Sequence, residues 1–295
     1  MILEIQKTFN GVGFWYINNK DNTIRYQVNN IKDLNNHIIP FFMKYHLRSG
    51  KLISFLKFKY IVDVMLTRAH WNNKDVFLSL IVISSQINPL GKLGNNTRYL
   101  TLDQQKYVVE GKHPEGVNVS ALDSMIKSFK CNPLNIDFLN GLIDGDGNIS
   151  VSFVKLKSVI HTSFNFTIIQ DIHNLQLLEE IRSYFGVGHI YTLNKNCSIF
   201  KTGSVSDLGK IILPKLGIIP QDVKGLHQIT YSNKVTIPII KRDKFLHSAR
   251  IVDLLLNSNN PNIKEIMIHS YYVSREWYNK KLNNYLLDLK FKLKI

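Results

Sequence analysis

The sequence predicts an α+β protein built from two related units, and three observations support this prediction. First, the segment LEIQKTFNGVGFWY at residues 3–16 returns as LEEIRSYFGVGHIY at residues 178–191. Second, each copy passes from helical spacing through glycines into strand-like alternation. Third, an acidic, glycine-rich junction, FLNGLIDGDGNISVSF at residues 138–153, joins a helical stretch to an alternating one. Because repeats signal repeated structural units, two copies of one supersecondary unit are expected.

The composition indicates a folded protein with a polyanionic partner. Of 295 residues, 44% are hydrophobic, which is enough for a buried core. The chain has 37 Lys and Arg against 22 Asp and Glu, a net charge of +15, which favours nucleic acid. Two cysteines and no metal-spaced Cys/His cluster argue against a zinc site or a disulfide framework. The longest apolar run, VFLSLIVI, is too short to span a bilayer, so no membrane partner is expected.

The two copies match in four segments that occur in the same order, which argues against a chance similarity. After the shared GVG, the segments NK, DL and IIP of the first copy correspond to NK, DL and ILP of the second, and IVD recurs at residues 61–63 and 251–253. In the second copy we predict a helix at residues 178–185, strands in HIYTL and SIFKTGSV, a helix that Asp207 opens and Pro214 closes, and a helix at residues 245–256. In the first copy we predict a helix at residues 54–66, which is the counterpart of the helix at residues 245–256.

These patterns divide the chain into four parts. Residues 1–66 are predicted to form a partial first unit, and residues 138–256 a second unit. Residues 67–137 are expected to be a turn-rich linker with one helix at residues 75–86. Residues 257–295 are expected to be a basic helical extension.

The glycine-rich junction places two carboxylates at the end of a helix. Leu139, Leu142 and Ile143 have helical spacing, so Asp144 and Asp146 lie at the C-terminal end, where the helix dipole disfavours negative charge. A cation would relieve that cost. Asp146 and the carbonyl of Gly145 form an oxygen cluster that suits Mg²⁺ or Ca²⁺. A plain Asp/Gly turn is the alternative. An EF-hand is excluded, because Ile149 and Lys155 stand where its loop needs Gly and Glu.

The segment LNGLIDGDG, residues 139–147, resembles the motif that names the LAGLIDADG homing endonucleases. It departs from the motif at Asn140 and Gly145, where the motif has Ala. Over residues 1–256 the chain looks like the two-repeat monomeric form of that family. The resemblance implies two αββαββα units related by a pseudo-two-fold axis. Their saddle-shaped antiparallel sheets would lie in the DNA major groove. The motif helices would pack side by side, with Gly141 allowing close approach and Asp144 bonding at the helix interface.

The resemblance also implies a reaction, namely Mg²⁺-dependent hydrolysis of both strands of a long, specific DNA site by an intron-encoded enzyme. Asp146 would hold the metal, Gln170 would order water, and Lys51 and Lys241 would stabilise charge or handle protons. For each lysine, a solvated surface position is the alternative. On the two strands after the motif, one polar face would read DNA, together with basic residues. The expected DNA contacts are Asn148, Ser150, Ser152, Lys155, Lys157, His161, Ser163, Asn165, Thr167, Lys195 and Lys201.

The junction occurs only once, although the repeat occurs twice. Gly186 lies 40 residues after Asp146, so the equivalent aspartate for Gly11 would precede Met1. The first unit is therefore expected to lack its motif helix, its first two strands and one catalytic aspartate. Three explanations stay open: a fragment of a longer reading frame, a decayed nuclease, or a maturase that binds its group I intron RNA.

The partners and the cellular setting follow from the same resemblance. The intact protein is expected to be a monomer, and a dimer through the motif helix is the alternative. The chain is rich in residues with AT-rich codons and shows no import leader pattern. A mitochondrial gene of fungal type is therefore expected.

Overall fold

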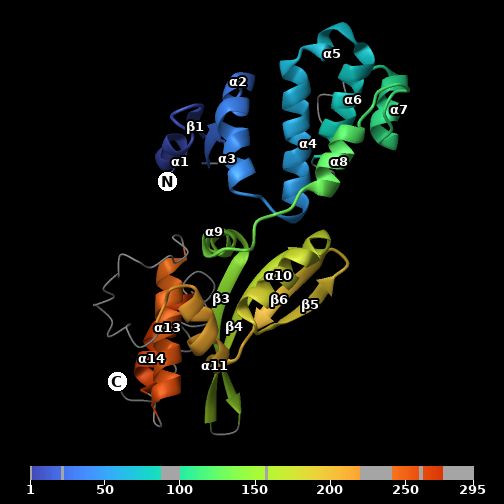
Figure 1. The fold of residues 1–295 in the computed structure, drawn as a ribbon. Coiled ribbons are helices and arrows are strands. Elements are labelled where there is room, and N and C mark those ends of the chain that lie inside the picture. Colours follow the sequence, from blue (N-terminus) through green and yellow to red (C-terminus); the bar gives the residue numbers. More distant parts are fainter. Residues whose placement is uncertain are drawn as a thin grey trace. The chain divides into compact units, whose positions relative to one another are not determined.

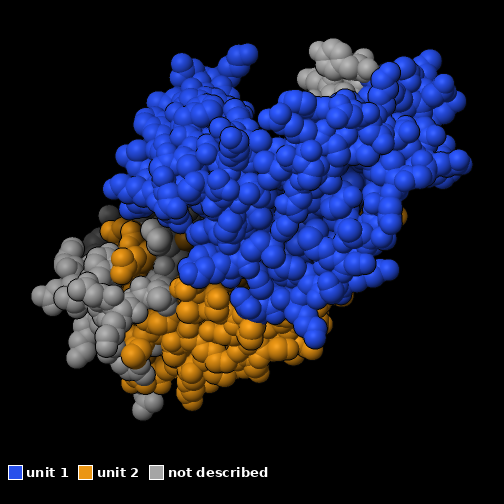
Figure 2. Space-filling model, turned by 45° about the horizontal axis from the view of Figure 1, so that its top comes forward, with its two compact units in different colours: residues 1–132 blue, residues 133–295 orange. Residues whose placement is uncertain are grey.

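The computed structural model describes residues 2–20, 23–87, 100–156, 159–219, 241–258 and 262–274. The chain divides into unit 1, Met1–Asn132, and unit 2, Pro133–Ile295 (Figure 2). Each unit has its own cluster of buried apolar side chains. Among the described residues, no helix is long and apolar enough to cross a membrane.

Unit 2 is organised around a four-stranded antiparallel sheet in the order β3-β4-β6-β5 (Figure 1). Alternating residues give the sheet one apolar face, on which Ile149, Phe166 and Phe200 are fully buried. Residues that face each other on paired strands point to the same side of the sheet. The polar residues that alternate with the apolar ones therefore lie together on the opposite face. The strands are β3 (Gly147–Leu156), β4 (Val159–Asp171), β5 (His189–Asn194) and β6 (Cys197–Thr202).

Helices cover the apolar face of this sheet. Helix α10 buries Leu178 and Ile181, and α13 buries Phe245 and Val252, all within one core cluster. The helices of unit 2 are α9 (Ile136–Asp146), η3 (Ile172–Asn174), α10 (Leu175–Phe185), α11 (Val205–Asp207), the π-helical turn η4 (Leu208–Ile212), α12 (Leu213–Lys215), α13 (Arg242–Asn257) and α14 (Ile263–Ser274).

Two local predictions differ from the structure after β6. The strand predicted in SIFKTGSV ends at Thr202, because Ser204 already caps the next helix and accepts a hydrogen bond from the amide of Asp207. The helix therefore opens at Ser204 rather than at Asp207. Pro214 does not close it but lies within α12. The π-helical turn η4 leads directly into α12, so the helical path continues through Pro214.

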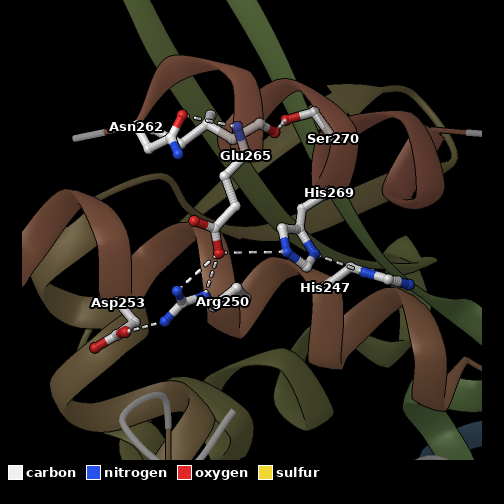
Figure 3. A network of polar contacts seen from close by, with 8 residues as sticks. His247, Arg250, Asp253, Asn262, Glu265, His269 and Ser270 are labelled. Carbon is white, nitrogen blue, oxygen red and sulfur yellow. Dashed lines mark hydrogen bonds and ion pairs between the residues drawn. The ribbon is translucent and has the colours of Figure 1, made fainter. Parts of the chain in front are cut away.

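A half-buried polar network joins α13 to α14 (Figure 3). Arg250 bonds to Asp253 at 2.9 Å on its own helix and to Glu265 at 2.7 Å on α14. The Nδ1 atoms of His247 and His269 are 2.8 Å apart. Burial lowers the pKa of His247, and burial followed by the nearby His247 lowers the pKa of His269 to about 4. Both rings are therefore neutral at pH 7.

Unit 1 contains a hairpin and a helical part. Strands β1 (Phe14–Asn18) and β2 (Thr23–Gln27) form a two-stranded antiparallel sheet. A small core is formed by Ile39, Phe55, Leu56 and Val62. The helices are α1 (Ile2–Thr8), α2 (Ile31–Asp33), the π-helical turn η1 (Leu34–Ile38), α3 (Ile39–Lys44), α4 (Ser49–Leu66), α5 (Ala69–Asn72), α6 (Lys74–Ser85), α7 (Leu102–Glu110) and α8 (Ser120–Ser128).

The described part of the segment predicted as a linker is largely helical. Between residues 67 and 137 the sequence predicts one helix, and the structure has α5, α6, α7 and α8 there, followed by the start of α9 at Ile136. Helix α8 belongs to the unit 1 core, because Met125 and Ile126 pack against it. A capping box, Thr101 with Gln104, begins α7 and could have been recognised in the sequence. Of the predicted C-terminal extension, α14 is described as a helix, and residues 275–295 lie outside the described residues.

The repeat found in the sequence is a structural repeat. The order α1, β1, β2, η1, α3, α4 of unit 1 returns as α10, β5, β6, η4, α12, α13 in unit 2. Trp15 pairs with Tyr26 in the first hairpin, and Ile190 pairs with Phe200 at the matching positions of the second. The glycines agree as well, with φ of 77° at Gly11 and Gly13, 77° at Gly186 and 88° at Gly188. Both copies therefore use the same left-handed turn.

Candidate active site

Helix α9 delivers the two motif aspartates to one end of the unit 2 sheet. Asn135 caps its first turn by accepting a hydrogen bond from the amide of Phe138. Leu139 and Ile143 anchor the helix in the core, each fully buried. The helix ends at Asp146, whose side chain is exposed, and β3 begins at the next residue.

Gly147 makes this direct passage from helix to strand possible. Its φ of −80° and ψ of 151° are extended, so the chain enters β3 without a loop. A Cβ at this position would lie 2.7 Å from Cα of Ile143 and 2.8 Å from its carbonyl oxygen. Only glycine fits that approach without backbone movement. Asp146 is thereby held rigidly at the sheet end.

Lys241 closes the C-terminal end of α9. Its ammonium donates hydrogen bonds to the carbonyl oxygens of Ile143 at 2.9 Å, Gly145 at 3.3 Å and Gly147 at 2.5 Å. Its backbone amide donates to the carboxylate of Asp144 at 3.2 Å. The sequence analysis expected a cation at this helix end, and the structure brings a lysine from the position immediately before α13. The positive charge offsets both the helix dipole and the neighbouring carboxylates.

Gln170 lies next to Asp146, and its expected task of ordering water stays a prediction. Its amide nitrogen donates to Oδ2 of Asp146 at 2.6 Å. Its amide oxygen accepts from Nδ2 of Asn174 at 3.2 Å, which fixes which end of the amide faces the carboxylate. Asn174, at the end of η3, was not among the predicted site residues. Its position four residues after Gln170 is the only signal that the sequence offers for it.

The polar face of the sheet begins beside this site. The register pairs Asn148 with Thr167, Ser150 with Asn165, and Ser152 with Ser163, so all six predicted contacts share the face opposite to the core. Asn148 and Ser163 are exposed, whereas Thr167 is only 9% exposed.

Lys201 joins the polar face from β6, because it pairs with Thr167. Lys195 lies exposed in the turn between β5 and β6. Two residues that the sequence analysis missed, His189 and Tyr191 of β5, are exposed on the same face, opposite Lys201 and Ile199. The alternation within HIYTL was the available signal for them.

Several predicted residues cannot be assigned a place in the site. The side chains of Lys155 and His161, and the whole of Lys157, lie outside the described residues. Lys51 is exposed in the first turns of α4 in unit 1. Gly141 is exposed on α9, and within the described part of unit 2 nothing lies within 4 Å of a Cβ built there. Its role, and that of Asp144, at a helix interface stays a prediction.

The donor chemistry at the end of α9 fits a hard divalent cation. The exposed carboxylate of Asp146 is an oxygen ligand, which Mg²⁺ and Ca²⁺ prefer. The adjoining carbonyl of Gly145, which the sequence analysis also assigned to the metal, accepts a hydrogen bond from the ammonium of Lys241 at 3.3 Å instead. In the described ranges of the chain, no three His, Cys, Asp or Glu residues gather in a group that could hold a metal.

Comparison with known sequences places the chain within one family. The family model described as LAGLIDADG endonuclease matches residues 1–62 and 139–221. A relative named probable intron-encoded DNA endonuclease 1, from Mycosarcoma maydis, is 32% identical over 208 residues, covering 70% of this chain and 72% of the relative. Probable intron-encoded endonuclease 2 from Neurospora crassa is 26% identical over 216 residues, covering 72% of this chain. The chain spans 45% of the length of that second relative.

Solved structures share the fold. The LAGLIDADG homing endonuclease I-SmaMI, bound to cleaved DNA, matches with a TM-score of 0.67 and 20% identity over 94% of this chain and 82% of that one. The homing endonuclease I-LtrWI, bound to target DNA, matches with a TM-score of 0.68 and 22% identity over 92% of this chain and 81% of that one. The α+β fold predicted from the sequence is confirmed.

The motif helix, the duplicated unit, the family model and the curated relative agree, and the chain therefore belongs to the LAGLIDADG family of DNA-cleaving homing endonucleases.

Proposed function

We propose that the chain acts as an intron-encoded, site-specific endonuclease that hydrolyses the phosphodiester bonds of a long DNA duplex with the help of Mg²⁺. The observation that supports this most directly is the exposed Asp146 carboxylate, held by Gln170 at 2.6 Å where the polar face of the sheet begins. One surface thus combines a metal-binding carboxylate with a row of groove-reading side chains.

Each residue has a defined task in this proposal. Asp146 would hold Mg²⁺, which when bound polarises phosphate oxygens and lowers the pKa of water. Gln170 fixes the orientation of the Asp146 carboxylate, and Asn174 fixes that of Gln170. Lys241 keeps the helix end in place and contributes positive charge beside it. We assign Lys51 the corresponding charge in unit 1, because it occupies the matching position before the IVD segment.

DNA recognition is assigned to the polar face and to the exposed lysines. Asn148, Ser150, Ser152, Ser163 and Asn165 offer donors and acceptors to base edges. Lys195 and Lys201 add positive charge for phosphates or guanine. The names of the relatives, intron-encoded endonucleases of two fungi, support a gene of organellar type, and we propose a mitochondrial one.

The decisive experiment compares two carboxylate variants on one helix. The full chain is first used to select its preferred site from a randomised duplex DNA library, and cleavage of that site is then measured with Mg²⁺. Asp146→Asn should abolish cleavage and leave binding within about threefold, because an amide no longer offers the metal a charged ligand. Asp137→Asn, in the first turn of the same helix, is the matched control and should cleave normally.

Three outcomes contradict parts of the proposal. Cleavage that survives Asp146→Asn would remove Asp146 from the reaction. A chain that selects a DNA site but never cuts it would be a DNA-binding protein without nuclease activity. A chain that ignores duplex DNA and binds group I intron RNA would be a maturase.

DNA binding should also weaken as the salt concentration rises. Each phosphate contact should add roughly −0.9 to the slope of the logarithm of the binding constant against the logarithm of the salt concentration.

A further inference from the structure

The ammonium of Lys244 reaches the first polar side chain of β3. Nζ of Lys244 lies 3.0 Å from Oδ1 of Asn148, a contact across 96 residues of sequence. Lys244 belongs to the first turn of α13, which packs against β3, the edge strand of the sheet. Asn148 lies two residues after Asp146, so this pair marks the end of the polar face that adjoins the candidate active site.

The contact fixes the direction of the asparagine amide. An ammonium group has only hydrogen-bond donors, so the amide atom that faces it must be the oxygen. The NH₂ group of Asn148 consequently points away from Lys244. Because Asn148 is exposed, that NH₂ group is available to a ligand on the polar face.

This orientation changes what an asparagine can read. An unconstrained Asn recognises adenine with two bonds, accepting from N6 and donating to N7. Here the acceptor is engaged by a cation, whose field also repels the amino hydrogens of adenine and cytosine. The NH₂ donors remain, and guanine offers two acceptors, O6 and N7, in the major groove.

We propose that Asn148, positioned by Lys244, is a guanine-reading element at the base pair nearest the cleavage centre. The inference rests on the proposed function, because it requires DNA to lie on the polar face. The side chains beside Asn148 on the sheet also suit a ligand rich in hydrogen-bond acceptors, as guanine is in the major groove. The register sets Asn148, Thr167, Lys201 and His189 in one row across the four strands, so a second ammonium group lies in the same row. Lys244 acts here as a positioning residue that determines specificity.

The test measures base preference without cleavage. The full chain selects its site from a randomised duplex library in the absence of Mg²⁺, and affinities are then measured for every single base-pair change in that site. The wild-type chain should prefer guanine over adenine at one position by about fivefold or more. Asn148→Ala should flatten the preference at that position and leave the other positions unchanged.

The Lys244 variants distinguish positioning from general charge. Lys244→Met frees Oδ1 of Asn148, so the preference at the same position should move from guanine towards adenine. Lys244→Arg keeps a donor and should keep guanine. Lys264→Met, at an exposed lysine of α14, removes the same charge and should leave the base-preference profile unaltered. Thermal melting of each variant verifies folding.

The experiment distinguishes a failure of this inference from a failure of the proposed function. If the wild-type chain selects a site but Asn148→Ala changes no single position, or Lys244→Met leaves the profile unchanged, the inference is wrong and the proposed function stands. If the wild-type chain selects no DNA site at all, both are wrong.

Discussion

The ammonium of Lys241 lies 2.9 Å from the carbonyl oxygen of Ile143, and this contact closes the end of the motif helix. With the bonds to Gly145 and Gly147, all three donors of the ammonium are engaged. The motif would otherwise leave free carbonyls and two carboxylates at the negative end of a helix dipole. A lysine therefore supplies part of the stabilisation that the sequence analysis assigned to a metal ion.

Lys241→Met should lower the free energy of unfolding by about 1–2 kcal/mol, because several carbonyls lose a charged donor at once. Chemical denaturation followed by circular dichroism measures this. Lys210→Met, an exposed lysine of η4, is the matched control and should change stability by less than about 0.5 kcal/mol. A Lys241→Met variant with unchanged stability but impaired cleavage would show that the lysine acts on DNA instead.

Gln170→Leu should raise the Mg²⁺ concentration needed for half-maximal cleavage by roughly tenfold, since partners of a metal ligand tune its affinity. The amide that holds Asp146 at 2.6 Å would be lost. Gln176→Leu on the exposed side of α10 should leave the metal requirement unchanged. If Gln170→Leu lowers the maximal rate at every Mg²⁺ concentration without shifting the midpoint, Gln170 does not act through the metal ligand.

Gly188→Ala should be far more damaging than Gly186→Ala, although both residues have positive φ. At Gly188 a new Cβ would lie 2.6 Å from the ring of Phe200, whereas at Gly186 it would meet no described atom within 4 Å. We expect a loss of roughly 2–4 kcal/mol at Gly188 and about 1 kcal/mol at Gly186. Equal losses in denaturant titrations would mean that backbone strain alone sets the requirement for glycine.

Stability should fall as the pH drops from about 6.5 towards 4, because His269 titrates differently in the folded and unfolded chain. Burial, followed by the nearby His247, lowers its pKa to about 4 in the folded protein, and the unfolded value is near 6.5. Between these values the unfolded chain binds more protons, so acid favours unfolding by up to about 1.4 kcal/mol per pH unit. The slope of unfolding free energy against pH measures this.

The control for this prediction is His269→Gln, which keeps a polar side chain but cannot titrate. Its slope between pH 6.5 and 4 should be shallower than that of the wild-type chain, while carboxylates contribute equally to both. Identical slopes would show that His269 does not control the acid sensitivity. His247 has a pKa that burial also lowers, so a residual slope is expected.

Local patterns in the sequence were enough to predict the junction, the strands and the repeat, whereas the antiparallel sheet was implied by the family resemblance. The alternation after Gly147 fixed which residues of β3 and β4 share a face, because strand periodicity allows one solution once Ile149 and Phe166 are buried. The GVG turns fixed the start of both hairpins, because the left-handed backbone there strongly favours glycine.

Other features depend on contacts between distant residues and could not be predicted. The hydrogen bonds from Lys241 to the end of α9 and to Gly147 span 94 to 98 residues of sequence. No sequence pattern indicates that residues so far apart in the chain are in contact. The histidine pair between α13 and α14 is likewise set by packing. The helices α7 and α8 were missed for a different reason, because each buries only one residue, Val108 and Leu122.

The absence of a loop at Gly147 has a mechanical consequence. The carboxylate of Asp146 and the amide of Asn148 sit on either side of one extended residue whose backbone packs against Ile143. In an endonuclease built this way, Gly147 fixes the position of the metal-binding carboxylate relative to the side chain that contacts the first recognised base. Under the proposed function, the distance between the cut and the first recognised base is therefore fixed, and a shift in recognition by one base pair would move the cut by the same amount.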